Sequence, residues 1–276
     1  MLKILLLTNN KNEIAEDYEI AKRLEADGHF VETSWLDYSG DLRSYDLILR
    51  RNVWVETESE VEDYRVKLDG LINKIKQLRI NSINLEELTN TKKDALVQLS
   101  KINENWIIPT RYLDDIDSLG DYKKFVVKEI DSAGSAFGQY FASKEEIKGL
   151  KLNSNKYIVQ PKISFCSEVQ FYYVGQELMY VLEYSPSKFP DYPKPRQIYV
   201  TYKEKFIADF YAVGSGFEYG FLRIDFLRTV DGSIKLMEME ATSPHMCFKD
   251  IPIFEKQRVI EKYISNVYAF VRNQAQ

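Results

Sequence analysis

The stretch that most constrains the fold covers residues 222–244, where two apolar runs flank the dipeptide Asp231-Gly232. An Asp-Gly pair between alternating apolar residues is a strong signal for two antiparallel strands joined by a tight turn. We predict a two-residue type I′ loop, with Val230 directly opposite Ser233. The chain around this hairpin must therefore form a sheet, and the register of the two strands follows from the loop.

The predicted register places four charged side chains on one face of the strand pair. Counting back from the loop puts Asp225 opposite Glu238, and Arg223 opposite Glu240. Two facing carboxylates destabilise a strand pair by up to about 1 kcal/mol unless a cation lies between them. Oxygen ligands alone favour Mg²⁺ or Mn²⁺, so one interpretation is a metal site. The other is a solvated face on which Arg223 pairs with Glu240. The opposite face is apolar and is expected in the core: Leu222, Ile224, Phe226, Met237 and Met239.

The composition is that of a soluble globular protein and excludes several functional classes. The 276 residues are 45% hydrophobic and 29% charged, with a net charge of −5, so a folded chain is expected. Nucleic-acid binding needs grouped Lys and Arg, and no such cluster occurs. The apolar run at residues 4–7 is too short for a secretory or membrane-spanning segment. Cys166 and Cys247 are the only cysteines, which favours a cytoplasmic protein without disulfides. A homodimer is compatible with the sequence.

The first part of the chain alternates strand and helix signals in the order of a parallel α/β domain. Apolar runs predict the strands, and apolar side chains at helical spacing predict the helices. The predicted strands cover residues 4–7, 30–35 and 45–55, and the predicted helices cover residues 13–27 and 58–79. No Gly-x-Gly-x-x-Gly follows the first strand, so a dinucleotide site of the Rossmann type is not supported.

Polar residues follow two of these strands. Residues 8–10 and 50–52 fall at carboxyl ends of strands, where ligands bind in open parallel sheets. Both polar clusters, including Arg50 and Arg51, are therefore candidates to bind an anionic substrate. Alternatively, one of the two arginines packs through its stem and the other is solvated.

A lysine followed by a loop of small residues indicates a phosphate site in the second part of the chain. Residues 125–128 predict a strand that ends in Lys128, and residues 132–138 include Ser135 and small residues whose backbone N–H groups can approach phosphates. In a Walker A loop or a protein kinase the glycines precede the lysine, so neither is indicated. A helix at residues 92–102 and an apolar strand that ends at Pro109 are expected before this strand.

The stretch around the hairpin resembles the metal-binding signature of the ATP-grasp superfamily, which includes glutathione synthetase and D-alanine–D-alanine ligase. The signature stands here as Arg223, Asp225, Phe226, Leu236, Glu238, Glu240 and Pro244. The resemblance implies that Asp225 and Glu238 hold Mg²⁺ on the ATP phosphates and that Glu240 completes a second metal site. It also implies that Arg223 stabilises the transferring phosphate. Glu240 departs from the commoner Asn but matches a Glu-x-Glu variant in related carboxylate–amine ligases.

The resemblance extends to the segments before the hairpin. A Leu-x-x-Leu helix before a Pro-Thr pair places one phosphate-binding lysine at Lys93, with Lys92 as the rival assignment. A lysine first and a small-residue loop second, as at Lys128 and Ser135, also fits the superfamily. The other implied site residues are Gln160, Pro161 and Lys162 at the adenine edge, Glu168 near the ribose, and Arg196 at the acyl-phosphate end.

The two histidines and the second cysteine receive no role in the predicted site. Cys247 lies two residues from His245, and we interpret Cys247 as a packed thiol rather than a nucleophile. His29 follows Gly28 where a helix is expected to give way to a strand, and we interpret it as a polar cap at that junction.

We therefore predict an α/β protein with the ATP-grasp fold. A small N-terminal α/β domain covers residues 1–88, and an ATP-grasp domain covers residues 89–276. The latter divides into a lid lobe near residues 90–160, built on a two-stranded sheet, and a C-terminal metal-binding lobe at residues 161–276. The implied function is an ATP- and Mg²⁺-dependent ligase that joins a carboxylate to an amine through an acyl phosphate, with small molecules or a peptide as substrates. The alternatives are a small-molecule kinase and an inactive ATP-binding partner protein.

Overall fold

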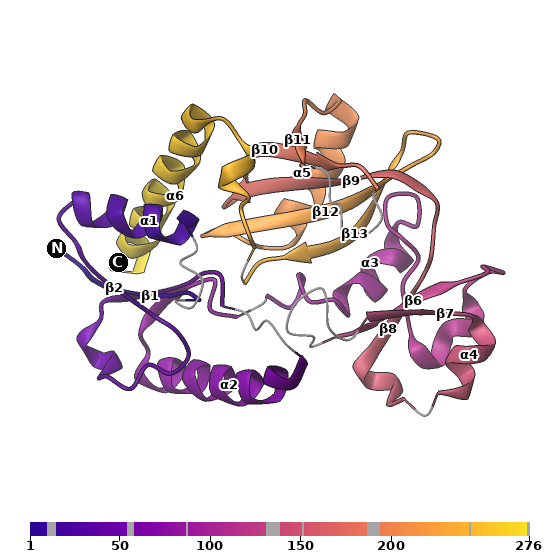
Figure 1. The fold of residues 1–276 in the computed structure, drawn as a ribbon, viewed down its shortest axis with the longest axis horizontal. Helices are drawn as coiled ribbons and strands as arrows, with labels where there is room; N and C mark the ends of the chain where they lie inside the picture. Colours follow the sequence, from indigo (N-terminus) through magenta and orange to yellow (C-terminus); the bar gives the residue numbers. More distant parts are fainter. Residues whose placement is uncertain are drawn as a thin grey trace.

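Three sheets make up the protein. The computed structural model describes residues 1–9, 15–53, 58–86, 88–130, 139–150, 152–186, 194–242 and 244–274. An N-terminal sheet, a central sheet and the sheet of a small lobe lie beside one another, with both chain termini at the N-terminal sheet (Figure 1). Within the described ranges, no helix has both the length and the apolar character needed to cross a bilayer.

The N-terminal sheet is parallel, with strand order β2-β1-β3-β4. Alternate residues of β1 face opposite sides, so Ile4 and Leu6 contact one core while Leu5 and Leu7 contact another. Helix α1 packs on the first side and α2 on the second, which confirms the expected α/β order. The bounds are β1 Lys3–Leu7, α1 Ala15–Ala26, β2 Phe30–Ser34, β3 Leu47–Arg50, α2 Val61–Leu78 and β4 Asn81–Ile83, with 3-10 turns at Leu42–Ser44 and Glu58–Glu60.

The small lobe carries a four-stranded antiparallel sheet of order β5-β8-β6-β7, not the two-stranded sheet that we expected. The apolar segment before Pro109 is not a full strand either. It makes a single bridge, from Ile107 to Leu236. The bounds are α3 Ala95–Ile102, β5 Arg111–Tyr112, β6 Phe125–Glu129, β7 Gln139–Ala142, α4 Lys144–Gly149 and β8 Tyr157–Pro161, with 3-10 turns at Leu113–Ser118 and Ser154–Lys156.

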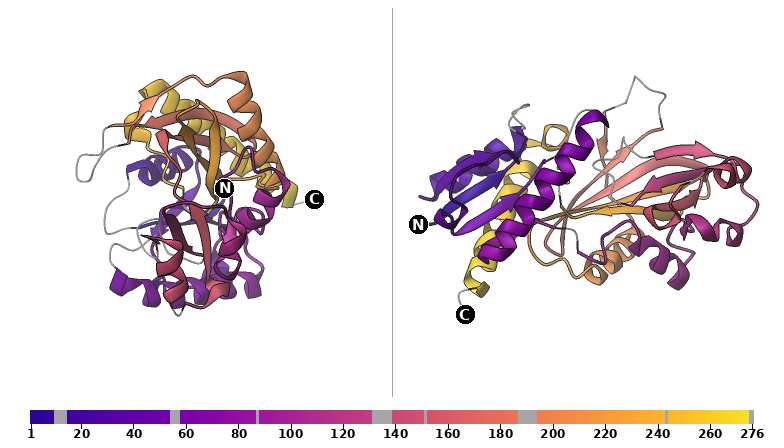
Figure 2. Two further views of the ribbon diagram at one scale, coloured as in Figure 1. Left: turned by 90° about the vertical axis from the view of Figure 1, so that its right-hand side faces the viewer. Right: turned by 90° about the horizontal axis from the view of Figure 1, so that it is seen from below.

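The central sheet has five antiparallel strands in the order β11-β10-β9-β12-β13. Helix α5 packs on its outer face, and α6 packs between its inner face and the N-terminal sheet (Figure 2). We use "inner face" for the side of this sheet turned toward the N-terminal sheet and the small lobe. The bounds are β9 Phe165–Val174, β10 Glu177–Tyr184, β11 Arg196–Gln197, α5 Tyr202–Gly214, β12 Phe221–Thr229, β13 Ile234–Glu240 and α6 Ile253–Gln274, with a 3-10 turn at Phe248–Asp250.

The loop of the β12–β13 hairpin is one residue longer than predicted. Thr229 N–H donates to Ser233 O at 2.8 Å, and Gly232 N–H donates to Thr229 O at 2.9 Å. The loop therefore holds three residues, and Gly232 lies in the left-handed region with φ +82°. This geometry is typical of a three-residue hairpin loop that ends in a glycine.

A bulge in β13 offsets the longer loop. Phe226 pairs with Leu236 while the neighbouring Asp225 pairs with Glu238, which leaves Met237 as the extra residue. The predicted pairing of the charged residues is thus confirmed, including Arg223 with Glu240. The predicted apolar face is wrong at one position, because Leu236 is buried in the core and Met237 is half-exposed.

Arg50 and Arg51 are both buried, so the expectation that one of them is solvated is wrong. Arg50 donates to Leu85 O at 2.8 Å and to the Tyr64 hydroxyl at 3.2 Å. Arg51 pairs with Glu16 and Asp17, each at 3.1 Å. Both guanidinium groups bond within the protein, and an anionic-substrate site at these residues is not supported.

Arg51 also ties the N-terminal sheet to the segment that follows β13. Its Nη2 donates to Pro244 O at 3.2 Å, and its guanidinium lies 4.5 Å from the ring centroid of Phe221. Glu16 accepts from Met246 N–H at 3.0 Å. This buried ion pair therefore fixes the chain directly after the metal-type signature.

Replacing Arg51 should strongly destabilise the fold. Arg51→Leu leaves Glu16 and Asp17 buried without their cation, and we expect the free energy of unfolding to fall by about 3–5 kcal/mol in urea titrations. Arg43→Leu is the control, because Arg43 forms an exposed pair with Asp41, and it should change stability by less than about 1 kcal/mol. Equal effects of the two variants would contradict the structural role of Arg51.

Candidate functional site

Four carboxylates gather on the inner face of the central sheet. Asp225 on β12 is cross-strand neighbour to Glu238 on β13, and Glu240 lies two residues further along β13. On the other side of β12, Glu168 of β9 pairs with Leu227, so its side chain lies near Asp225. Asp225 is only 1% exposed. A group of acids this dense and this buried requires positive charge nearby.

The cations come from two different sheets. Arg223, on the same strand as Asp225, donates to that carboxylate at 2.8 Å and pairs with Glu240 at 2.7 Å. Lys128, at the end of β6 in the small lobe, lies 3.6 Å from Glu238 and is 3% exposed. The carboxylate cluster therefore joins the central sheet to the small lobe.

The two lysine candidates before α3 differ in position. Lys93 is half-buried and its Nζ donates to Glu129 O at 3.4 Å. The positive charge of Lys93 also lowers the pKa of Glu238. Lys92 is exposed. The structure brings Lys93, rather than Lys92, to the side of Lys128 and Glu238.

The pKa values indicate that the cluster is short of positive charge. Burial raises the pKa of Asp225 and of Glu240 above their ordinary values, even though Arg223 opposes the shift. Burial, together with the charge of Asp225, raises the pKa of Glu168 to about 7. Burial also acts on Glu238, but the charges of Lys128, Lys93 and Arg223 together outweigh it, and the pKa of Glu238 is lowered.

The set of oxygen ligands fits a hard divalent cation, but two of the carboxylates are paired with Arg223. All the acidic ligands are oxygens, the type that Mg²⁺ and Mn²⁺ prefer. Within the described part of the chain, no three His, Cys, Asp or Glu side chains are arranged around one metal position. Arg223 instead bonds Asp225 and Glu240. Metal binding here requires these carboxylates to turn away from the guanidinium.

The residues predicted at the adenine edge connect the two lobes. Gln160 is buried, and its Nε2 donates to the Thr110 hydroxyl at 3.0 Å and to Met237 O, in the β13 bulge, at 3.4 Å. Pro161 ends β8 opposite Phe125. The exposed Lys162 lies with its ammonium 4.7 Å from the ring centroid of Phe141.

Arg196 is not brought to the cluster. It pairs with Glu183 at 2.8 Å, and its side chain is 77% exposed. Glu183 also pairs with Arg228, which in turn pairs with Glu204 of α5, so this network lies on the outer face of the sheet. The structure therefore does not bring Arg196 to the carboxylates, because side-chain alternation turns it away from them. The predicted phosphate loop at residues 132–138, including Ser135, lies outside the described residues.

Sequence reasoning missed Gln170 and Tyr172, which form a row of polar side chains on β9 with the predicted Glu168. Gln170 Nε2 donates to Glu168 Oε1 at 2.7 Å, and the Tyr172 hydroxyl donates to Gln170. These three residues occupy alternate positions of one strand. The two-residue period of residues 168, 170 and 172 along the strand is the signal that could have found them.

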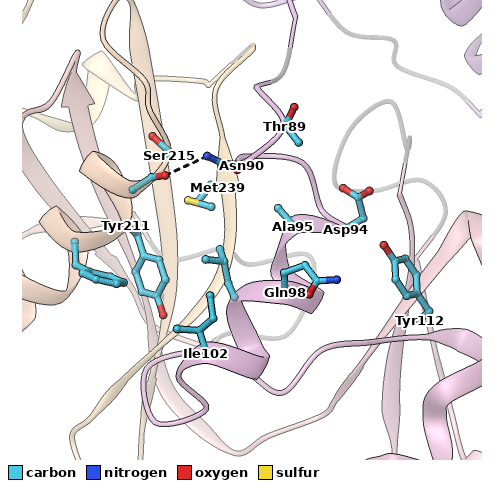
Figure 3. A pocket seen from close by; sticks show the side chains of 13 residues that line it. Thr89, Asn90, Asp94, Ala95, Gln98, Ile102, Tyr112, Tyr211, Ser215 and Met239 are labelled. Atoms are coloured by element: carbon cyan, nitrogen blue, oxygen red, sulfur yellow. Dashed lines mark hydrogen bonds between the residues drawn. The ribbon is translucent and has the colours of Figure 1, made fainter.

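A separate cavity lies between α3 and α5 on the outer face of the central sheet (Figure 3). Its volume is about 350 Å³, and its lining includes Gln98, Ile102, Tyr211 and Met239. Met239 alternates with Glu238 and Glu240 along β13, so the cavity opens on the side of the strand opposite to the carboxylates.

Comparison with known structures identifies the fold. No protein-family profile matches the chain, and no curated protein sequence matches it either. The chain is similar to D-cycloserine synthetase DcsG, with 16% identity, a TM-score of 0.72, and coverage of 95% of this chain and 99% of the other.

It is also similar to D-alanine–D-alanine ligase from Bacillus anthracis (13% identity, TM-score 0.67, 99% and 100% coverage). A third similar structure is the ATP-grasp ligase PsnB (11% identity, TM-score 0.64, 97% and 99% coverage). The likeness extends over nearly the whole chain in each case. The protein has the ATP-grasp fold, as predicted.

Glu168 should make the stability of the protein depend on pH. Its folded-state pKa of about 7 lies above the ordinary value of 4.5, so folding favours the protonated side chain. The stability that this gives the protein is fully present at low pH and is lost as the pH rises through 7. Glu168→Gln removes this dependence while the new amide oxygen still accepts from Gln170. Relative to the native protein, the variant should gain up to about 3 kcal/mol between about pH 5 and pH 8, measured by urea unfolding without nucleotide or metal.

The control for this experiment is Glu25→Gln, since Glu25 is exposed on α1. Its stability difference from the native protein should be the same at both pH values. If the stability difference between Glu168→Gln and the native protein does not change with pH, the surroundings of Glu168 do not disfavour its ionised form.

Proposed function

We propose that the protein is an ATP- and Mg²⁺-dependent carboxylate–amine ligase that forms an amide bond through an acyl phosphate. The observation that carries the proposal is the meeting of lysines near the small-lobe sheet with the Asp225, Glu238 and Glu240 carboxylates of the central sheet. Within an ATP-grasp fold, this arrangement provides charge on both sides of a phosphate chain.

Each residue of the cluster has a role in this proposal. Lys93 and Lys128 neutralise the phosphates of the nucleotide, while Asp225, Glu238 and Glu240 hold Mg²⁺. The metal, when bound, neutralises charge that develops on the transferring phosphoryl group. Arg223 can pair with equatorial phosphoryl oxygens through its planar fork of donors. The catalytic contribution is therefore positioning and electrostatics.

The substrate class is a small carboxylate and an amine, either free or within a peptide. The support is indirect: D-alanine–D-alanine ligase is among the similar structures and is complexed with ATP. PsnB is seen with a minimal precursor, Mg and ADP, and the macrocyclase MdnC with a precursor peptide. The proposed domains are residues 1–88 and 89–276, with the nucleotide between the small lobe and the central sheet.

A hydroxamate screen tests the proposed function. The protein is incubated with Mg²⁺·ATP, hydroxylamine and one carboxylate at a time, drawn from the protein amino acids, D-alanine, D-serine and short peptides. Hydroxylamine traps acyl phosphates, so the proposal predicts a hydroxamate and an equal amount of ADP for at least one carboxylate. ADP with a phosphorylated hydroxyl product would indicate a kinase, and the absence of ADP throughout would contradict both activities.

The carboxylates should control metal-dependent nucleotide binding. A ligand at 100 times its Kd stabilises the folded state by about 2.7 kcal/mol, which appears as a rise in Tm. We expect Asp225→Asn and Glu238→Gln to abolish most of the Tm rise that Mg²⁺·ATP produces. Asp231→Asn is the matched control, because Asp231 lies in the exposed loop of the same hairpin. Unchanged shifts in both site variants would remove the hairpin from the nucleotide site.

Arg223 should matter more for turnover than for ATP affinity. Arg223→Lys keeps the charge and loses the fork geometry, so kcat should fall by about 100-fold or more with a much smaller change in the Kd of ATP. Arg228→Lys is the control, since Arg228 lies on β12 but faces Glu204 on the outer side. Native turnover in Arg223→Lys would show that Arg223 is only an ion-pair partner of Glu240.

A further inference from the structure

A second group of reactive side chains lies on the inner face, beside the carboxylate cluster. Its members are Cys247 and His245, from the segment that follows β13. His245 Nδ1 lies 3.3 Å from Cys247 Sγ and 3.3 Å from the backbone N–H of Cys247. Unprotonated, this nitrogen accepts from the backbone; protonated, it donates to a thiolate. Cys247 adopts the left-handed conformation, with φ +52°, a strained geometry for a residue other than glycine and one that is frequent at functional sites.

The surroundings of the pair can hold its charges. The hydroxyls of Tyr184 and Tyr172 lie 3.3 and 3.5 Å from Cys247 Sγ. On the far side of the imidazole, Glu16 Oε2 lies 3.9 Å from His245 Nε2. The Tyr184 hydroxyl can donate to the sulfur, whereas the hydrogen of the Tyr172 hydroxyl is directed to Gln170. The imidazole ring lies between the sulfur and a carboxylate.

These contacts lower the pKa of Cys247 and raise the pKa of His245, which favours a thiolate beside an imidazolium. Burial alone raises the pKa of the Cys247 thiol, but the hydrogen bond and charge of His245, with the Tyr184 hydroxyl, lower it below its ordinary value. The bond to Cys247 and the charge of Glu16 raise the pKa of His245, against burial and the opposing charge of Arg51. Nearly half of the His245 side chain is exposed, so the pair is accessible to a ligand.

The Tyr172 side chain links Cys247 to Arg223, one of the residues proposed to act in phosphoryl transfer. Tyr172, which contacts Cys247, is the cross-strand partner of Arg223. Its hydroxyl donates to Gln170, which in turn donates to Glu168. Arg51 and Glu16 bond the backbone at Pro244 and Met246, and this fixes the position of the segment that carries the pair.

We propose that Cys247 and His245 form the proton acceptor for the incoming amine, an inference that rests on the proposed ligase function. An amine substrate is an ammonium at neutral pH and must lose a proton before it attacks. The Cys247 thiolate takes that proton and becomes a thiol. The amine nitrogen then attacks the acyl carbon, the C–N bond forms, and the C–O bond to phosphate breaks with its electron pair leaving on phosphate. The second amine proton leaves with the phosphate, and the thiol returns its proton to solvent through His245.

The first test measures the ionisation of Cys247 without any substrate. The native protein is alkylated with iodoacetamide between about pH 6 and pH 9, and both cysteines are quantified by peptide mass spectrometry. The exposed Cys166 is the internal reference. We expect the midpoint of the alkylation-rate profile to lie at lower pH for Cys247 than for Cys166. His245→Asn should remove most of that difference. Equal midpoints in the native protein would overturn the proposal.

The second test separates proton acceptance from carboxylate activation. With the carboxylate that the hydroxamate screen identifies, hydroxylamine needs no base at neutral pH because it is already unprotonated. Cys247→Ala and Cys247→Ser should keep hydroxamate formation within about twofold and lose about 100-fold in ligation of a primary amine. The loss should shrink as the pH rises and the amine deprotonates by itself. Cys166→Ala is the control, with both activities unchanged.

Three outcomes of this second test contradict the proposal. Equal loss of hydroxamate and amine product would mean that Cys247 only supports the structure. An acyl adduct on Cys247, seen by intact mass, would mean that the thiolate is a covalent acceptor instead. Failure of the native protein to form any hydroxamate would overturn the ligase function itself, while the alkylation profile still decides whether the thiolate pair exists.

Discussion

The concentration of negative charge on one face of the β12–β13 hairpin is the constraint on which the site depends. Asp225 is buried opposite Glu238, and neither carboxylate would be tolerated there without the Arg223 guanidinium and the Lys128 ammonium. Because Lys128 belongs to the small lobe, the attraction that favours the ionised form of Glu238 also holds the two lobes together. In the proposed function, a nucleotide with its metal would bring both signs of charge into this space and replace these pairs.

A second buried ion pair positions the other half of the site. The place of Arg51 after a strand of the N-terminal sheet predicted that it faces a ligand, but its guanidinium is buried and pairs with Glu16. They bond the backbone at Pro244 and Met246 and so hold the segment that carries His245 and Cys247. The N-terminal sheet thus contributes to the site indirectly, by fixing a loop of the central lobe.

The sequence predicted the fold and the charged register well, but not the details that depend on backbone irregularity. An Asp-Gly pair is compatible with a two-residue or a three-residue loop, and nothing in the sequence marked the bulge at Met237. The register of Asp225 and Glu238 was correct because the two departures cancel. Arg196 was misplaced because a family resemblance gives a region and not the face of a short strand. The sequence showed Cys247 and His245 only as a spacing of two residues, and it did not predict the left-handed backbone at position 247.

The central claim is that the carboxylate cluster supports transfer of the γ-phosphoryl group of ATP to a substrate carboxylate. The most direct measurement follows ¹⁸O from a labelled substrate carboxylate during complete turnover with Mg²⁺·ATP and an amine. The account predicts that the released phosphate carries one ¹⁸O atom from the carboxylate, because cleavage of the acyl phosphate leaves that oxygen on phosphorus. Unlabelled phosphate, or ADP formation with no free phosphate, would contradict it.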